Sequence, residues 1–237
     1  RRIHPFVERF GIDLDEVELP VDQYPTFNAF FTRRLKTGAR PFSADLDFLC
    51  SPGDGKALVF PELATGVEFP VKGASVTPAA LLASAAAAAP FAGGAALIVR
   101  LAPPDYHRFH FPDDGHAESA RLIPGHCHSV NPIALRRVPD LFRRNRRTVT
   151  HIESAHFGPV AYVEVGAFAV ASIIQTFAPG PIARGQEKGY FQFGGSTLTL
   201  LFAPGAVSFD KDLVRDSATG LETQVRAGER VGRRGEG

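Results

Sequence analysis

The feature that most constrains the fold is a series of short apolar runs, separated by glycine and proline, that begins at about residue 47. The runs include KALVF, VEFPVKG, AALIVRLAP, AYVEVGAFAVASII, STLTLLF and GAVSF. Runs of this length between turn residues are typical of strands that pair with their sequence neighbours in antiparallel sheets. We therefore predict an α+β fold with a mainly antiparallel, sandwich-like β-sheet core and N-terminal helices.

The first residues carry a helical pattern. In RRIHPFVERFGI, apolar residues recur at helical spacing, namely Ile3, Phe6, Val7 and Phe10. Such a stripe packs on the protein or lies on a bilayer surface, and packing is the simpler interpretation. Further on, Thr26 is the expected N-cap of a short aromatic helix that stops near Gly38. The alanine-rich segment PAALLASAAAAAPFAGG predicts a short helix followed by a loop.

Composition narrows the class of protein. The 237 residues carry a net charge of only +1, which gives no sign of bulk nucleic-acid binding. Cys50 and Cys127 lie far apart, so we expect two buried thiols rather than a zinc site or disulfide framework. No apolar run is long enough to span a membrane. The chain has no Met and begins with Arg, as expected of a trimmed or processed chain. We expect one domain, residues 1–237.

Histidines are concentrated in one part of the chain. Seven of the eight fall between residues 107 and 156, with His107 and His110 in DYHRFHFPDDGH and His126 and His128 in GHCHSV. Clustered histidines suggest a metal site, but the H-E-x-x-H and H-x-x-E-H patterns are absent. Prolines on both sides of DYHRFH argue against the helix that would place two rings on one face. We therefore expect no metal.

Asp54 lies in the glycine-rich turn SPGDG, just before a predicted strand. Aspartate and glycine fill turns for backbone reasons, and this structural role is the simpler interpretation. A turn aspartate can also orient a histidine and fix its tautomer for work as a base.

The stretch GYFQFGGSTLTLLF, residues 189–202, reads as one strand interrupted by two glycines and a serine. Ser196 does not stand in the G-x-S-x-G pattern of esterases. Local sequence favours a β-bulge with a hydrogen-bonded serine. The alternative is that the Ser196 hydroxyl attacks the carbonyl of Gly195, which requires a distorted peptide and a base.

Six blocks taken together resemble the phosphatidylserine decarboxylase family. In chain order they are FNAFFTRRLKTGARPF, SPGDG, DYHRFHFP, HSVNPIAL, FGPVAYVEVGAFAV and GYFQFGGST. The similarity runs from about residue 3 to residue 232. Each block alone is a weak signal, but six in family order, including Y-H-R-x-H and G-S-T, are specific.

The resemblance implies a proenzyme that cuts itself between Gly195 and Ser196. Residues 1–195 become the large subunit and residues 196–237 the small one, with Ser196 converted to a pyruvoyl group. The self-cleavage triad maps onto Asp54, His110 and Ser196, with His110 as the base and Asp54 orienting it. His107 is the candidate for handling the substrate carboxylate or delivering a proton. The pyruvoyl group forms a Schiff base with phosphatidylserine and releases CO2 and phosphatidylethanolamine, without external cofactor or metal.

The resemblance also implies partners. The substrate, phosphatidylserine, lies in a membrane, so we expect peripheral membrane association, on the cytoplasmic face if the source is bacterial. The N-terminal stripe and the cationic run RRVPDLFRRNRR, residues 136–147, suit an anionic leaflet, although a solvated face explains the run equally well. No aromatic platform accompanies it, so we expect no RNA binding. A homodimer of cleaved pairs is possible by analogy.

Some positions depart from the family pattern, namely Gly53, Val76, His128 and Arg146. They leave the head-group contacts open. The alternatives are a pyruvoyl decarboxylase of another serine-bearing lipid or amino acid derivative, and a non-catalytic lipid-binding β domain in which Ser196 never reacts.

Overall fold

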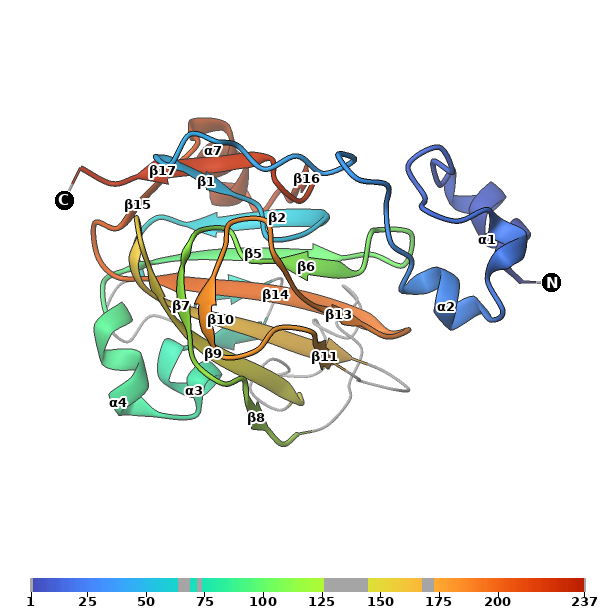
Figure 1. Cartoon of the computed structure of the whole chain (residues 1–237). Helices are drawn as coiled ribbons and strands as arrows, with labels where there is room; N and C mark the ends of the chain where they lie inside the picture. The colour runs from blue at the N-terminus through green and yellow to red at the C-terminus, as the bar shows by residue number, and fades with distance from the viewer. Residues whose placement is uncertain (1, 64–68, 72–73, 126–144, 168–172, 237) are drawn as a thin grey trace.

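The computed structural model describes residues 2–63, 69–71, 74–125, 145–167 and 173–236. Antiparallel strands make up most of the body, and two helices near the N-terminus lie at one end of it (Figure 1). The predicted α+β fold, with a mainly antiparallel β core and N-terminal helices, is confirmed.

Nine strands of the described residues form the largest sheet. Their order is β12, β7, β9, β10, β14, β5, β2 and β16, and β8 pairs with β9. The bounds are β2 Gly55–Phe60, β5 Ala95–Leu101, β7 Gly115–Ala117, β8 Arg121–Ile123, β9 Arg147–Ser154, β10 Gly158–Ala167, β12 Gly180–Ile182, β14 Gly195–Phe202 and β16 Thr223–Val225. All neighbours are antiparallel. Strand β14 therefore lies in the interior of the sheet, between β10 and β5.

Smaller sheets surround the large one. One contains β11 (Ile173–Gln175), β13 (Glu187–Phe191) and β6 (Arg108–His110), and is called the small sheet below. Another contains β1 (Phe48–Cys50), β17 (Arg230–Arg234) and β15 (Val207–Phe209), while β3 (Phe69–Val71) pairs with β4 (Ala74–Val76). The remaining helices are α3 (Pro78–Leu82), α4 (Ala85–Ala88), the 3-10 turn η2 (Ala89–Phe91) and α7 (Lys211–Ala218).

The large sheet separates two hydrophobic clusters, because successive side chains of a strand point to opposite faces. On β14, Leu198 joins the cluster that contains Phe109 of β6 and Phe191 of β13. Leu201 points to the other face and joins the cluster that contains residues of α3 and α4. The small sheet therefore covers one face of the large sheet, and the alanine-rich helices cover the other.

The N-terminal helices are α1 (Ile3–Phe10) and α2 (Phe27–Phe31), with the 3-10 turn η1 (Val21–Gln23) between them. Thr26 caps α2, as predicted, by accepting a hydrogen bond from the Ala29 N–H. The predicted stop at Gly38 is wrong, because α2 ends at Phe31. Beyond it the chain becomes extended, and Leu35 forms a β-bridge with Val17.

The apolar stripe of α1 is only partly packed. Ile3 is buried, whereas Phe10 is 42% exposed. Phe6 contacts Phe10 and also Phe27 of α2, with ring centroids 4.8 and 5.0 Å apart. The core-packing interpretation therefore holds for the start of the stripe and fails for its end.

Two further predictions about secondary structure need correction. Residues 189–202 do not form one interrupted strand: β13 and β14 belong to different sheets, and residues 192–194 connect them. The alanine-rich segment forms two short helices rather than one, because Ala83 adopts the left-handed conformation at φ 51° and ends α3. Ser84 then caps α4.

A buried polar network joins the two facing sheets. Lys188 of β13 and Glu164 of β10 form an ion pair at 2.5 Å, and neither side chain has any exposed surface. Lys188 also donates to Gln175 of β11 at 2.8 Å, and the Thr148 hydroxyl of β9 donates to Glu164. Burial lowers the pKa of Lys188, and the Glu164 carboxylate opposes that shift.

We expect Lys188→Met to cost about 3–5 kcal/mol of unfolding free energy, because it leaves the Glu164 charge buried without its partner. Adding Glu164→Gln should recover much of this loss, since no buried charge then remains. Urea unfolding of the Ser196→Ala chain, in which the expected cleavage is blocked, measures both variants. Equal destabilisation by the single and double changes would contradict the argument.

Candidate active site

Ser196 is the second residue of β14, and strands on both sides fix its backbone. It pairs with Gly166 of β10 and with Leu101 of β5. Its position two residues before Leu198 places it on the face of β14 that meets the small sheet. Ser196 is 1% exposed, and its Oγ has no hydrogen-bond partner in the described part of the chain. The bulge with a satisfied serine is therefore not what the chain forms.

The two candidate histidines lie at the ends of β6, a strand of the small sheet that covers this face. His107 immediately precedes β6, and its carbonyl accepts from the Phe191 N–H at 3.0 Å. His110 ends β6, and its N–H donates to the Pro52 carbonyl at 2.8 Å. The small sheet thus joins the histidine segment to β13 and to the turn that carries Asp54.

His107 is fully buried and held in one tautomer. Its ring stacks on Phe31 with centroids 3.8 Å apart, and its Nε2 lies 3.1 Å from the Ala102 carbonyl oxygen. Because a carbonyl only accepts, Nε2 carries the proton and Nδ1 keeps a lone pair. Nδ1 has no partner among the described residues. Burial, reinforced by the Arg33 charge, lowers the pKa of His107 to about 3, so the ring is neutral at pH 7.

His110 is also neutral at pH 7. Burial lowers its pKa to about 4, against the attraction of the Glu187 and Asp54 carboxylates. Its ring lies beside Tyr106 and Phe42, with centroids 5.8 Å away in each case. Its Nδ1 is enclosed and has no partner within the described ranges. A neutral imidazole with an unused nitrogen is able to accept a proton from a hydroxyl.

Asp54 is paired with an arginine rather than with His110. Its carboxylate accepts from Arg40 Nε at 2.9 Å, from Arg40 Nη2 at 2.7 Å and from the Ala227 N–H at 2.8 Å. No hydrogen bond joins Asp54 to His110 in the described residues, so the expected orienting contact is not formed here. The Asp54 charge still acts on His110 and favours its protonated form.

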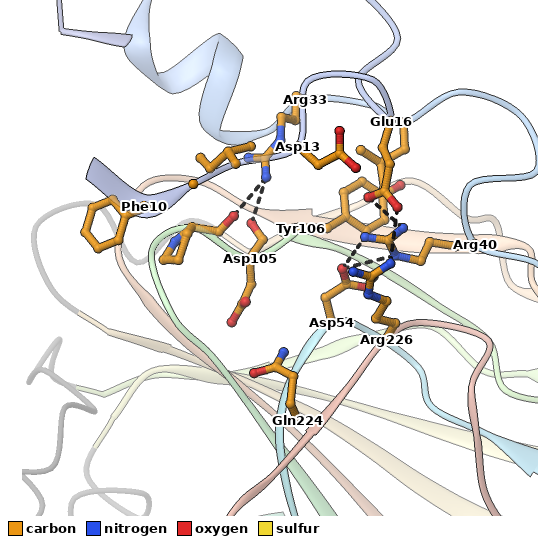
Figure 2. Close-up of a pocket in the computed structure, with 14 residues that line it drawn as sticks. Phe10, Asp13, Glu16, Arg33, Arg40, Asp54, Asp105, Tyr106, Gln224 and Arg226 are labelled. Carbon is orange, nitrogen blue, oxygen red and sulfur yellow. Dashed lines mark hydrogen bonds and ion pairs between the residues drawn. The ribbon is translucent and has the colours of Figure 1, made fainter. Parts of the chain in front are cut away.

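A cavity of about 290 Å³ lies beside this arrangement, between the N-terminal segment and the edge of the large sheet. Figure 2 shows the side chains of Asp54, Tyr106, Arg33 and Gln224 around it. Arg40 bridges Asp54 and Glu16 on its wall. Of the four candidate catalytic residues, only Asp54 lines the cavity. His107 and Ser196 lie below the molecular surface.

Among the described residues, His116, His156 and Cys50 take no part in the contacts of this arrangement. His116 is exposed on β7, and His156 bonds Asp113 at 2.9 Å. Among the described residues no three potential ligand side chains gather to hold a metal ion. Cys50 is buried, as expected, whereas His126, His128 and Cys127 lie outside the described residues.

The prediction that the cationic run lies on the surface is wrong for its last residue, Arg147. Residues 136–144 lie outside the described part of the chain. Arg147 is 2% exposed and donates to the carbonyls of Leu81, Ala80 and Asn145. It supports α3 from inside the protein and belongs to neither a solvated nor a membrane-facing surface.

Sequence reasoning missed the residues that support the site. Arg40 and Phe31 both stand in the block FNAFFTRRLKTGARPF, but nothing in the sequence pairs Arg40 with Asp54 or Phe31 with His107. Lys188 was likewise missed, since a single lysine in a strand gives no sign of a buried partner. The available signal was its partner Glu164, an isolated charge inside the apolar run AYVEVGAFAV.

The two neutral histidines predict a pH dependence of stability. Their folded-state pKa values lie below the ordinary value of 6.5, so the unfolded chain binds more protons as the pH falls towards 4. We expect each to contribute about 2 kcal/mol of stability at pH 7 that is lost by pH 5. Urea unfolding of the Ser196→Ala chain at both pH values tests this. His110→Asn should remove roughly half of the loss in unfolding free energy between pH 7 and pH 5 that the two rings cause. An unchanged loss would show that the His110 ring is not responsible for its share.

No helix among the described residues is long and apolar enough to cross a membrane. The phosphatidylserine decarboxylase family model matches residues 27–233. A phosphatidylserine decarboxylase proenzyme of Chlamydia muridarum is 47% identical over 235 residues, which cover 99% of this chain and 78% of that protein. The proenzyme of Ruminiclostridium cellulolyticum is 43% identical over 233 residues, 98% of this chain and 78% of its own length. The chain therefore belongs to the phosphatidylserine decarboxylase family.

Proposed function

We propose that the chain cleaves itself between Gly195 and Ser196 and then decarboxylates phosphatidylserine with the pyruvoyl group formed at position 196. The observation that carries the proposal is the Ser196 hydroxyl, which is buried and has no hydrogen-bond partner among the described residues. It lies on the face of β14 that the small sheet covers, and the two neutral histidines lie at the ends of a strand of that small sheet. A buried hydroxyl without a partner is costly. Proteins commonly tolerate such an unpaired polar group at a position where that group takes part in a reaction.

In this proposal His110 takes the proton of the Ser196 hydroxyl as Oγ attacks the Gly195 carbonyl. The peptide C–N bond breaks, the proton passes to the released amine, and an ester links Gly195 to Ser196. Removal of the Ser196 α-proton then expels the Gly195 carboxylate by β-elimination. Water adds and ammonia leaves, which produces the pyruvoyl group. The Asp54 charge stabilises protonated His110, and Arg40 keeps that carboxylate in place.

The residues around position 196 fit a pyruvoyl group, because the serine that gives rise to it is already buried and fixed by strands on both sides. When formed, the group supplies an electron sink for the bond that releases CO2. His107 Nδ1, which has no partner among the described residues, would accept a proton from the substrate ammonium and return one after CO2 has left. Burial keeps water away from this exchange.

We propose that residues 1–237 act as one catalytic domain even after cleavage into 1–195 and 196–237. Strands of the smaller piece are built into sheets of the larger one. Strand β14 lies between β10 and β5, β16 pairs with β2, and β17 pairs with β1. Separation of the pieces would break all of these ladders.

We propose peripheral membrane association through the N-terminal region, on the cytoplasmic leaflet in a bacterial cell. Large apolar side chains are exposed there and in the turn before Ser196, namely Phe10, Leu14, Leu19 and Phe193. Each is about 40% exposed, and Phe193 packs directly on Phe27 of α2. Apolar side chains of this kind insert at the boundary between head groups and acyl chains.

The test uses the purified full chain and vesicles that contain phosphatidylserine with a labelled serine carboxyl. We expect release of labelled CO2, and its loss after treatment with borohydride, which reduces the pyruvoyl ketone. Soluble serine and phosphoserine are the comparison substrates, because a pyruvoyl enzyme of small amino acids would prefer them. Vesicle binding without CO2 release would support the non-catalytic lipid-binding domain instead.

A further inference from the structure

Residues 192–194, which precede Gly195 and the expected cleavage point, contact a helix and belong to no sheet. Strand β13 ends at Phe191 and β14 begins at Gly195, so residues 192–194 lie outside both strands. Within this turn the Phe193 N–H donates to Asn28 Oδ1 at 3.0 Å. Asn28 lies in the first turn of α2, at the end of the molecule where the N-terminal helices lie (Figure 1).

Helix α2 also holds the Phe193 ring. The ring meets Phe27 and Phe31 edge to face, with centroids 5.3 and 5.1 Å apart. Phe31 in turn stacks on His107. The helix therefore contacts both the turn before the cleavage point and one of the candidate catalytic histidines.

Side-chain hydrogen bonds stabilise both ends of helix α2. Thr26 caps its first turn, and the Thr32 hydroxyl donates to the Asn28 carbonyl at 3.0 Å. The Asn28 side chain therefore extends from a helix with hydrogen bonds at both ends, and its oxygen accepts from the backbone of the turn.

The position of this contact matters because two glycines follow it. Glycine loses more conformational freedom than any other residue when it is fixed. Ser196 is paired with both β10 and β5, whereas Gly195 is paired with β10 alone and Gly194 precedes β14. An anchor at Phe193 limits how far the Gly195 carbonyl moves from the Ser196 hydroxyl, which lowers the entropy cost of the attack.

We propose that Asn28 is a positioning residue for self-cleavage, because its amide oxygen anchors Phe193 and so keeps the Gly195 carbonyl beside Ser196. The inference rests on the proposed self-cleavage. It gives a role in that reaction to Asn28, a residue far from the cleavage point in the sequence. The N-terminal helices then take part in forming the prosthetic group, in addition to any contact with lipid.

The test compares two substitutions of nearly equal size in the full chain. Asn28→Leu removes the acceptor, whereas Asn28→Asp keeps an oxygen at the same place and suits the first turn of a helix. Self-cleavage is followed by gel electrophoresis after cell-free synthesis. We expect Asn28→Leu to cleave about tenfold more slowly than the parent and Asn28→Asp at close to the parent rate. Both should melt at the parent temperature in the uncleaved Ser196→Ala background.

Each other outcome has a definite meaning. Cleavage of Asn28→Leu at the parent rate overturns the inference and leaves the proposed function intact. Equal slowing by both substitutions also overturns it, because the acceptor oxygen would then not matter. A lower melting temperature for Asn28→Leu that accounts for its slow cleavage assigns Asn28 to the fold alone. A parent chain that never cleaves refutes the proposed function first.

Discussion

Ser196→Ala should abolish both self-cleavage and decarboxylation. The substitution removes the nucleophile and the precursor of the pyruvoyl group in one step, so no partial activity is expected. Its structural cost should be small, because Oγ has no hydrogen-bond partner in the described part of the chain and alanine fits the space of serine. Gel electrophoresis after long incubation with phosphatidylserine vesicles, together with CO2 release, measures the two losses.

Ser196→Thr is the matched control for that prediction. Threonine keeps a hydroxyl at the same atom and favours strands, so we expect slow cleavage rather than none. Circular dichroism and urea unfolding should show the native fold in both variants. Cleavage of the Ser196→Ala chain at the parent site would contradict the assignment of Ser196 as the nucleophile.

Substitution of His110 and substitution of His107 should impair different steps. His110→Asn should slow self-cleavage by roughly 10²–10⁴-fold, which is the usual contribution of a positioned base. His107→Asn should still cleave, since His110 remains, but should lose decarboxylation by a comparable factor. The measurement is the fraction of cleaved chain over time, followed by CO2 release per cleaved chain.

The control for this pair is His116→Asn, which alters an exposed ring on β7. It should match the parent in both assays. Normal cleavage of His110→Asn, or an uncleaved His107→Asn chain that still folds, would contradict the division of roles between the two rings.

Much of the fold was predictable because its local signals agree with its tertiary structure. Short apolar runs predicted the antiparallel core, and Thr26 predicted the start of α2. Prediction failed where long-range pairing overrides local pattern. Residues 189–202 look like one strand, but their two halves pair with strands from distant parts of the chain.

The sequence motifs selected the candidate residues, but the contacts of those residues could not be predicted from the sequence. The motifs indicated Asp54, His107, His110 and Ser196, and the fold brings their segments together through the small sheet and its neighbouring turn. The partners of these residues depend on packing between distant segments. Arg40 lies on Asp54 only because the chain after α2 returns to the edge of the large sheet, and spacing alone does not reveal that.

The pairing of Asp54 with Arg40 refines the role expected from the resemblance. A carboxylate that already accepts four hydrogen bonds from three N–H groups has little capacity left to orient a ring. Its contribution to His110 is therefore electrostatic, and Arg40 moderates it. The Asp54 charge therefore partly offsets the burial that lowers the pKa of His110.

The most direct test of the account is the intact mass of the purified, denatured full chain. We predict two fragments with the break between Gly195 and Ser196, the smaller of which carries a carbonyl that borohydride reduces. A single mass for residues 1–237, unchanged after long incubation with phosphatidylserine vesicles, would contradict the central claim that this chain generates its own pyruvoyl group.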